Sequence, residues 1–321
     1  MQRPKMDAKH GQDDRKSRWK FGQNFLVDEI VIRQIAEDVP CLPTDWILEI
    51  GPGAGAITRR LLPRCQKLTA IEIDSKWVEH LRKHPEWGNL EVIQADATRI
   101  DVEDVLRRSA PQSDSKPFVV GNLPYNRAAP ILFRFLPFIH RFQAMNIMVQ
   151  YEVGKRICAK PHSRDFGFLS VFIQNHATAE MLQKIPQEAF RPRPKVFSAT
   201  VRLTPLAAPK TEDPMFLRFV ELAFAQKRKK MSNSLLPFYS KEKVETALIA
   251  IGSADAESAL NENARAEDLS VDQFVAAFKI LGAPQGVLPR RENPPDISGL
   301  GVEDEEFALG DGSETDDGEE D

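Results

Sequence analysis

The chain has 321 residues, 42% of them apolar, and a formal net charge of −4. This length and composition can fill the cores of one large domain and a smaller one, while no apolar stretch approaches the length of a membrane span. Residues 1–20 lack the apolar segment of a signal peptide, and three scattered cysteines suggest free thiols, so we expect a cytoplasmic protein that does not associate with membranes.

The charge is distributed unevenly along the chain. The last 30 residues, 292–321, contain 13 Asp and Glu and no Lys or Arg, so the preceding residues carry a net charge of +9. A basic body favours a polyanionic partner, although a charge of this size also serves solubility alone. The acidic end is interpreted as a solvated extension or, alternatively, as a mimic of RNA that regulates the basic face.

Short apolar runs alternate with helical patterns through the first two thirds of the chain, as in a parallel sheet covered on both faces. The expected strands are 46–51, 67–74, 90–96, 118–124, 146–151, 178–185 and 197–203. The expected helices of this part are 30–39, 76–83 and 131–138.

The periodicity becomes helical after Pro214, with expected helices at 216–226, 241–251 and 271–281. We therefore predict four parts: a polar arm at 1–19, a catalytic domain at 20–206, a small helical domain at 207–282, and an acidic, disordered tail at 283–321.

The first strand of the predicted sheet leads into "EIGPGAGAIT", residues 49–58. Gly51, Gly53 and Gly55 allow a sharp turn and a close approach to a ligand, and we expect the next helix near Ala56 with its amide dipoles aimed at that ligand. A glycine loop is a weak signal alone, because Ala56 occupies the third glycine position of the dinucleotide fingerprint.

Two carboxylates strengthen the prediction of a nucleoside-containing cofactor. Glu72 ends the second strand, where it can accept hydrogen bonds from ribose hydroxyls, and Asp96 ends the third, where it can accept from an adenine amino group. Both fall at the edge of an open sheet where ligands bind. A nicotinamide dinucleotide and S-adenosylmethionine both fit these features.

The segment "NLPY", residues 122–125, follows the fourth strand and favours S-adenosylmethionine. The Asn122 Oδ1 atom and the Leu123 carbonyl, exposed by Pro124, can accept the hydrogens of an exocyclic adenine amine, and Tyr125 can stack on the base. These acceptors would free the lone pair of the amine for in-line attack on a sulfonium methyl, which needs placement more than a strong base.

An ordered series of motifs between residues 20 and 281 resembles the ribosomal RNA adenine N6,N6-dimethyltransferases. The series comprises "KFGQNFL" (20–26), "LEIGPGAGAIT" (48–58), "IEID" (71–74), "QADA" (94–97), "NLPYN" (122–126), "FRPRPKVFSATVRL" (190–203), "AFAQKRKKMSNSL" (223–235) and "RAEDLSVDQF" (265–274).

The resemblance implies a class I methyltransferase fold, α/β and Rossmann-like, with a seven-stranded, mostly parallel sheet and a small C-terminal helical domain. It implies dimethylation of two adjacent adenines in the 3′-terminal hairpin loop of small-subunit ribosomal RNA, within a pre-ribosomal particle and by a monomer. The implied S-adenosylmethionine contacts are Gln23, Asn24, Leu26, Gly51, Gly53, Gly55, Glu72, Ile73, Asp96, Ala97 and Asn122. The implied contacts to the target adenine are Asn122, Leu123, Pro124 and Tyr125, with Phe190 stacked on the other face of the base.

Basic residues are the expected RNA contacts. Arg191, Arg193 and Lys195 lie near the expected target pocket, and a basic run follows at the end of a predicted helix, where it also complements the helix dipole. The run consists of Lys227, Arg228, Lys229 and Lys230.

The chain departs from the family pattern at three places. Arg127, Ala128 and Ala129 stand where Ile-Ser-Thr is usual, Tyr151 replaces a usual lysine, and Phe168 takes a position that is often polar.

Alternatives to the main interpretation are a dimethylase of large-subunit RNA, a noncatalytic RNA-binding assembly or transcription factor, and an N6-adenine DNA methyltransferase. Leu123 disfavours the last, because the corresponding loop of DNA enzymes has a proline there. His80 and His84 have the spacing of a zinc-binding pair without a third ligand, so we expect no metal.

Overall fold

The computed structural model describes residues 24–112, 114–226, 228–254 and 260–287. The predicted arm at 1–19 and most of the predicted tail at 283–321 lie outside these ranges. Within them, every helix is too short or too polar to cross a bilayer.

Seven strands form one sheet in the order β4-β3-β2-β5-β6-β9-β7. Strands β2 to β6 pair in parallel, whereas β9 runs antiparallel to both β6 and β7. This arrangement confirms the mostly parallel, seven-stranded fold expected from the sequence. The strand bounds are β2 Trp46–Ile50, β3 Lys67–Glu72, β4 Leu90–Gln94, β5 Phe118–Asn122, β6 Ala144–Gln150, β7 Ala177–Ile185 and β9 Ser198–Pro205.

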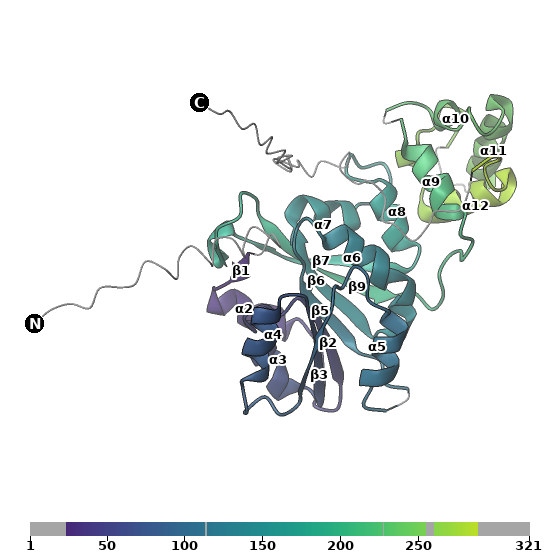
Figure 1. Cartoon of the computed structure of the whole chain (residues 1–321). Helices are drawn as coiled ribbons and strands as arrows, with labels where there is room; N and C mark the ends of the chain where they lie inside the picture. The colour runs from purple at the N-terminus through teal and green to yellow at the C-terminus, as the bar shows by residue number, and fades with distance from the viewer. Residues whose placement is uncertain (1–23, 113, 227, 255–259, 288–321) are drawn as a thin grey trace, which may run out of the picture.

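Helices cover both faces of the sheet, as the figure shows (Figure 1). Helices α2 (Glu29–Glu37), α3 (Thr58–Leu61) and α4 (Ser75–Arg82) lie on one face. Helices α5 (Val102–Ser109) and α6 (Ala128–Phe135) lie on the other. Two separate apolar clusters fill the space beneath them, which is why strands such as β2 are buried along their whole length.

Several boundaries differ from the sequence predictions. Helix α3 begins at Thr58 instead of near Ala56 and has only four residues, so it supplies little helix dipole. Helices α5, α7 (Tyr151–Ile157) and α8 (Phe168–Gln174) were not predicted. Tyr151 was assigned to a strand but begins α7, because its neighbours Val153 and Gly154 pack the turn against the sheet. Short 3-10 helices occupy Leu62–Arg64, Leu136–Arg141, Gln187–Ala189 and Ala266–Asp268.

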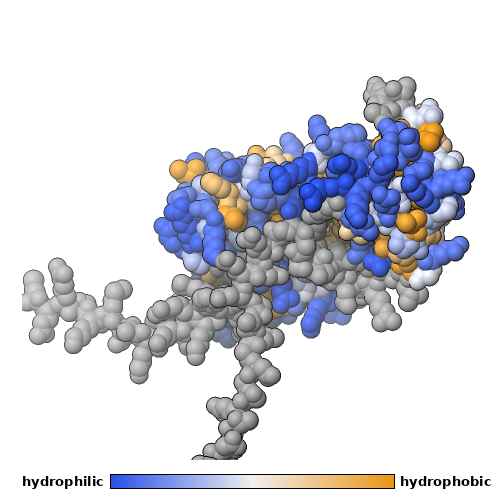
Figure 2. Space-filling model, turned by 90° about the horizontal axis from the view of Figure 1, so that it is seen from above, coloured by the Kyte–Doolittle hydropathy of each residue, from blue (hydrophilic) through white to orange (hydrophobic). Residues whose placement is uncertain are grey.

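In the described part of the chain, four helices follow the sheet: α9 (Phe216–Phe224), α10 (Met231–Ser234), α11 (Lys241–Ala254) and α12 (Val271–Leu281). Phe219 packs against Phe278 and Tyr239, with ring centroids 5.6 and 6.2 Å apart. The apolar core continues from this unit into the sheet domain, where Phe166 lies 6.4 Å from Phe224. The face seen in Figure 2 is mainly hydrophilic, with hydrophobic residues in small separate groups.

A second sheet consists of only two short strands, β1 (Phe25–Leu26) and β8 (Phe190–Arg191), paired antiparallel. Leu26 lies opposite Phe190, so residues more than 160 positions apart in the sequence meet beside the main sheet. The ribbon brings the first motif of the chain to the carboxyl edge of the parallel strands, where the candidate site lies.

Candidate active site

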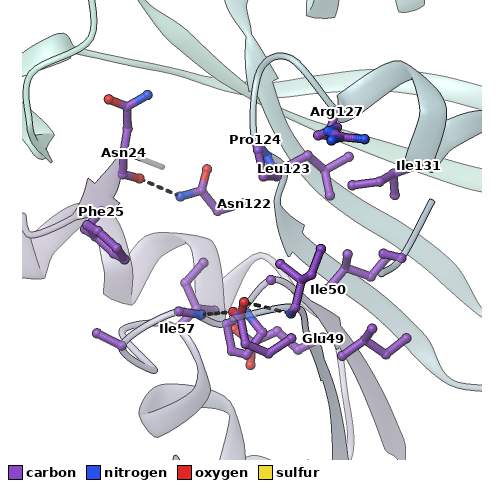
Figure 3. A pocket seen from close by; sticks show the side chains of 18 of the residues that line it. Asn24, Phe25, Glu49, Ile50, Ile57, Asn122, Leu123, Pro124, Arg127 and Ile131 are labelled. Atoms are coloured by element: carbon purple, nitrogen blue, oxygen red, sulfur yellow. Dashed lines mark hydrogen bonds between the residues drawn. The ribbon is translucent and has the colours of Figure 1, made fainter. Parts of the chain in front are cut away.

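An open pocket of about 1120 Å³, including the solvent at its mouth, lies at the carboxyl edge of β2 to β5 (Figure 3). This is the edge at which open α/β sheets bind ligands. The predicted site residues that line it are Asn24, Leu26, Gly51, Gly53, Glu72, Ile73, Asp96, Ala97, Asn122, Leu123, Pro124 and Tyr125. Five separate segments of the chain therefore meet around one pocket.

The glycine loop turns directly beneath this pocket. Gly51 has φ +66° and continues the sheet pattern by donating its amide to the Ile71 carbonyl at 2.9 Å. Gly55 has φ +80° but does not line the pocket. A Cβ atom at Gly55 would lie 2.9 Å from the Trp87 ring, so we interpret this glycine as a packing requirement and not as a ligand contact.

Replacing Gly55 with alanine should destabilise the fold by about 2–3 kcal/mol, the sum of left-handed strain and of overpacking against Trp87. Gly51→Ala is the matched control, because its Cβ would meet only the Asn122 carbonyl oxygen at 3.9 Å. We expect only the conformational cost there, about 1 kcal/mol. Urea unfolding without cofactor measures both, and equal losses would contradict the packing role of Gly55.

Glu72 is held rigidly at the end of β3. Its Oε2 atom accepts the Gly53 amide at 3.0 Å, and its Oε1 atom accepts the amides of Ile73 and Asp74 at 2.9 Å each. Burial raises the pKa of this carboxyl, although the three backbone hydrogen bonds oppose the shift. A carboxylate has about four acceptor positions, so one position on Oε2 remains for a ligand.

Asp96 follows β4 and uses one oxygen to hold its own turn. Its Oδ1 atom accepts hydrogen bonds from the Thr98 amide at 2.8 Å and the Thr98 hydroxyl at 2.7 Å. Partial burial raises the pKa of Asp96, but the Thr98 hydrogen bonds and the charges of Arg127 and Arg99 outweigh it, so the net pKa is lowered. Asp96 is therefore an ionised acceptor at neutral pH.

Glu49 is a pocket residue that the sequence analysis did not single out. Its side chain is 2% exposed, and the Thr58 hydroxyl donates to its Oε2 atom at 2.7 Å. Burial raises the pKa of Glu49 to about 7, against the lowering effect of the Thr58 hydrogen bond. Its position inside "LEIG" and its burial on a central strand were the signals available in the sequence.

The raised pKa of Glu49 predicts a pH-dependent stability. The folded state holds the proton more tightly than the unfolded chain, so this contribution is complete below about pH 4.5 and is lost as the pH rises through about 7. Glu49→Gln mimics the protonated form and keeps an acceptor for Thr58. Relative to wild type, we expect this variant to gain about 2–3 kcal/mol between pH 4.5 and pH 8 in urea unfolding. A pH-independent difference would contradict the prediction.

Asn122 ends β5 and points into the pocket. Its Nδ2 atom donates to the Asn24 carbonyl oxygen at 3.1 Å (Figure 3). This hydrogen bond fixes the orientation of the amide, because a flipped amide would place two oxygens together. The Oδ1 atom is thus left as a positioned acceptor.

The next three residues form the wall beside Asn122. The Leu123 side chain is buried and its amide donates to the Met148 carbonyl at 3.1 Å, which anchors the loop to β6. The Tyr125 hydroxyl lies 2.6 Å from the Ser198 hydroxyl at the start of β9. Burial raises the Tyr125 pKa, with a smaller opposing effect from Ser198, so the phenol stays protonated.

Phe190 does not occupy the position expected of a stacking partner. Its side chain is fully buried and belongs to the apolar cluster that includes Leu26, because β8 pairs with β1 in that register. It does not line the pocket. The stacking of Phe190 on the target base stays a prediction from the family resemblance.

The basic residues have separate surroundings. Arg193 pairs with Glu188 and with Gln187, while Arg191 donates to the Phe190 carbonyl at 2.8 Å. Lys195, Arg228 and Lys229 are exposed, and Lys230 contacts Asn263. Gln23 and Lys227 lie outside the described residues.

The basic run was predicted to lie at the end of a helix. Its described residues, Arg228, Lys229 and Lys230, instead lie beyond the last residue of α9. Helix α9 ends at Phe224 with no basic residue in its final turn, so the dipole argument for this run fails.

Several pocket residues were missed. Phe25 lines the entrance and packs edge-on against Trp77 at 5.2 Å, although it belongs to a quoted motif. Arg127 lines the pocket from the residue before α6, Ile131 from the first turn of α6, and Thr98 from the loop after Asp96. Only the tertiary structure brings these residues together, because nothing in their spacing along the sequence predicts a shared pocket.

No cluster of His, Cys, Asp and Glu among the described residues has the arrangement of a metal site. His84 instead lies 2.7 Å from Glu86 and stacks on Trp87.

The sheet order and the site define a class I methyltransferase. A nucleoside cofactor fits a pocket with a spare acceptor on the buried Glu72, an ionised Asp96 and a glycine loop. The crystal structure of a dimethyladenosine transferase from Plasmodium falciparum shares the fold, with a TM-score of 0.65 and 21% identity over 81% of this chain and 99% of that chain. The crystal structure of the 23S rRNA methyltransferase ErmE has a TM-score of 0.60 and 28% identity over 80% of this chain and 99% of that chain.

The chain belongs to the family described as ribosomal RNA adenine dimethylase, whose model matches residues 14–282. The ribosomal RNA small subunit methyltransferase A of Geobacter metallireducens is 37% identical over 84% of this chain and 98% of that protein. The protein of the same name from Chlorobium chlorochromatii is 34% identical over 82% of this chain and 92% of that protein. The chain is thus an rRNA methyltransferase that uses S-adenosylmethionine, as the sequence resemblance implied.

Proposed function

We propose that this enzyme dimethylates N6 of two adjacent adenines in the 3′-terminal hairpin loop of small-subunit ribosomal RNA. The observation that carries the proposal is the fixed Asn122 amide, whose Oδ1 atom faces a pocket that Glu72 and Asp96 also line. The small-subunit target rests on the names of the relatives that cover more than 80% of the chain.

Two sets of residues would divide the pocket between cofactor and base. Glu72 would accept from the ribose and Asp96 from the adenine amine of S-adenosylmethionine, while Asn24, Leu26, Ile73 and Ala97 would line the rest. Asn122 Oδ1 and the Leu123 carbonyl would accept the two N6 hydrogens of the target adenine. Tyr125 would stack on its ring.

Bound S-adenosylmethionine supplies an activated methyl group. The two acceptors would hold the N6 hydrogens aside and leave the nitrogen lone pair free to attack that methyl group. The resulting ammonium is acidic and loses its proton to water, so the reaction needs no strong base. The protonated Tyr125 phenol, bonded to Ser198, serves position and not proton transfer.

RNA contacts are proposed for Arg191, Arg193 and Lys195 near the pocket and for the run at 227–230. Residues 207–282 would form the helical domain that presents this run, and 20–206 the catalytic domain. We also propose that the enzyme acts as a cytoplasmic monomer on a pre-ribosomal particle. Its positive body would make binding weaken as salt increases.

The test is methyl transfer from labelled S-adenosylmethionine to small subunits from a strain that lacks the modification. We expect label in N6,N6-dimethyladenosine after RNA digestion. The likeness to ErmE motivates large subunits as the second substrate in the same assay. Label only in large-subunit RNA would overturn the proposed target, and cofactor binding without transfer to either subunit would indicate a binding function.

A further inference from the structure

Two aromatic rings and a lysine form a compact cluster where β6 passes into α7. The Lys184 Nζ atom lies 4.4 Å from the centroid of the Tyr151 ring and 4.1 Å from the centroid of the Phe197 ring. The Tyr151 amide donates to the Phe197 carbonyl at 2.9 Å, which holds the two rings on one corner of the sheet. We call Tyr151, Lys184 and Phe197 the aromatic corner.

The aromatic corner adjoins the target-base pocket. Ser198 follows Phe197 directly, and its hydroxyl lies 2.6 Å from the Tyr125 hydroxyl. In the sheet, Asn122 lies opposite Met148 on β6, while Gln150, two residues further, lies opposite Ser198. The corner therefore lies near the residues that would hold the reacting adenine, at the same edge of the sheet.

The composition of the corner matches a nucleotide. The Phe197 side chain is 42% exposed, and so aromatic surface remains open although Lys184 covers part of the ring. Lys184 is exposed and has no carboxylate within ion-pair distance among the residues that the structure describes. An open ring beside an uncompensated cation can stack a base and meet its phosphate, and stacking of this kind tolerates different bases.

A neighbouring cation behaves differently. Lys155 also lies over the Tyr151 ring, at 5.5 Å, but it pairs with Glu152 at 2.6 Å. Its charge is therefore largely compensated, and Lys184 remains as the cation of the corner that can meet an anion.

We propose that the aromatic corner binds the unpaired nucleotide next to the target adenine, with its base stacked on Phe197 and its phosphate on Lys184. This inference rests on the proposed function for the identity of the RNA. It assigns to the corner a binding site for single-stranded RNA that keeps the flanking nucleotide in place while the adenine occupies the pocket.

Three variants separate the contributions of the corner. Phe197→Leu removes the aromatic face and keeps apolar bulk, and Lys184→Met removes the charge and keeps the stem. Val196→Ala is the matched control, because Val196 is the neighbouring exposed apolar residue, 38% exposed, and has no ring. The affinity of each variant for S-adenosylmethionine should equal that of wild type, which verifies that the cofactor site is intact.

The probe is a fluorescein-labelled, single-stranded RNA decamer with two adjacent adenines and a purine on each side. Two further decamers carry an abasic residue in place of one flanking purine. Anisotropy titrations should show that wild type binds the intact decamer about 10-fold more tightly than one abasic decamer. Phe197→Leu should bind these two decamers equally. The logarithm of the binding constant falls as the logarithm of the salt concentration rises. Lys184→Met should make this slope shallower by about 0.7, which corresponds to one lost phosphate contact.

The outcomes also separate this inference from the proposed function. Wild type that fails to bind the intact decamer, or binds all three decamers alike, overturns the aromatic corner as a nucleotide site. Reduced methylation of small subunits by Phe197→Leu, with unchanged decamer affinity, would assign the corner to a ribosomal protein or to Tyr125 packing and also overturn it. Absence of dimethyladenosine with wild type contradicts the proposed function, while the decamers still decide the inference.

Discussion

Replacing Asn122 with alanine should reduce methyl transfer by about 100- to 1000-fold at saturating S-adenosylmethionine, the range for loss of one positioned polar group. The variant loses the acceptor that holds one N6 hydrogen. It also loses the hydrogen bond from Nδ2 to the Asn24 carbonyl, which ties the β1 ribbon to the catalytic loop. The measurement is the rate of N6,N6-dimethyladenosine formation on unmodified small subunits.

Asn126→Ala provides the matched control for this experiment. Asn126 belongs to the same five-residue motif but is exposed and does not line the pocket. Its loss should change the rate by less than about twofold, in line with the small effects of surface substitutions. Similar defects in both variants would mean that the loss comes from a general disturbance of the loop. An active Asn122→Ala enzyme would mean that the loop acts through its backbone alone. Either outcome would contradict the role of the Oδ1 atom.

Replacing Glu72 with alanine should weaken S-adenosylmethionine binding by about 100-fold. One charge-assisted hydrogen bond to a ribose hydroxyl accounts for about 1.5–3 kcal/mol, and each 1.4 kcal/mol corresponds to a factor of ten. The variant also leaves the amides of Gly53, Ile73 and Asp74 without their acceptor, so the glycine loop loses its support. Calorimetric titration of the purified protein measures the dissociation constant.

A cofactor analogue without ribose hydroxyls distinguishes direct binding from loop support. If Glu72 binds the ribose, wild type should lose most of its affinity for the analogue, and Glu72→Ala should bind analogue and cofactor about equally. If Glu72 only supports the loop, the analogue should lose the same factor with both proteins. That second outcome would contradict the proposed ribose contact.

The predictions for the central strands were accurate because their evidence is local. Strand β2 is apolar from Trp46 to Ile50 except for Glu49, and every one of its side chains is buried. Helix α8 escaped prediction for the opposite reason. Helix α8 is apolar on all sides, with Phe168 and Phe172 both buried, so it shows no helical period.

Site residues show the same division. Glu72 and Asp96 could be named from the sequence because each ends a predicted strand, and parallel strands bring their carboxyl ends to one edge. Arg127 and Glu49 could not be named on that basis, because their place in the pocket depends on how α6 and the start of α3 at Thr58 pack on the sheet. The motif around Phe190 predicts a ring that stacks on the target base, whereas pairing of Phe190 opposite Leu26 buries this ring.

The sequence by itself determined the family, the cofactor class and the parallel sheet, since those follow from ordered motifs and from the period of apolar residues along the chain. The tertiary structure alone decided which groups share a surface. It placed the Asn24 carbonyl on the Asn122 amide, and Lys184 between the rings of Tyr151 and Phe197. The physical reason is that hydrogen bonds and cation–π contacts depend on distances between residues of different strands. The register of β1 with β8 and of β7 with β9 sets these distances, and no local sequence pattern encodes that register.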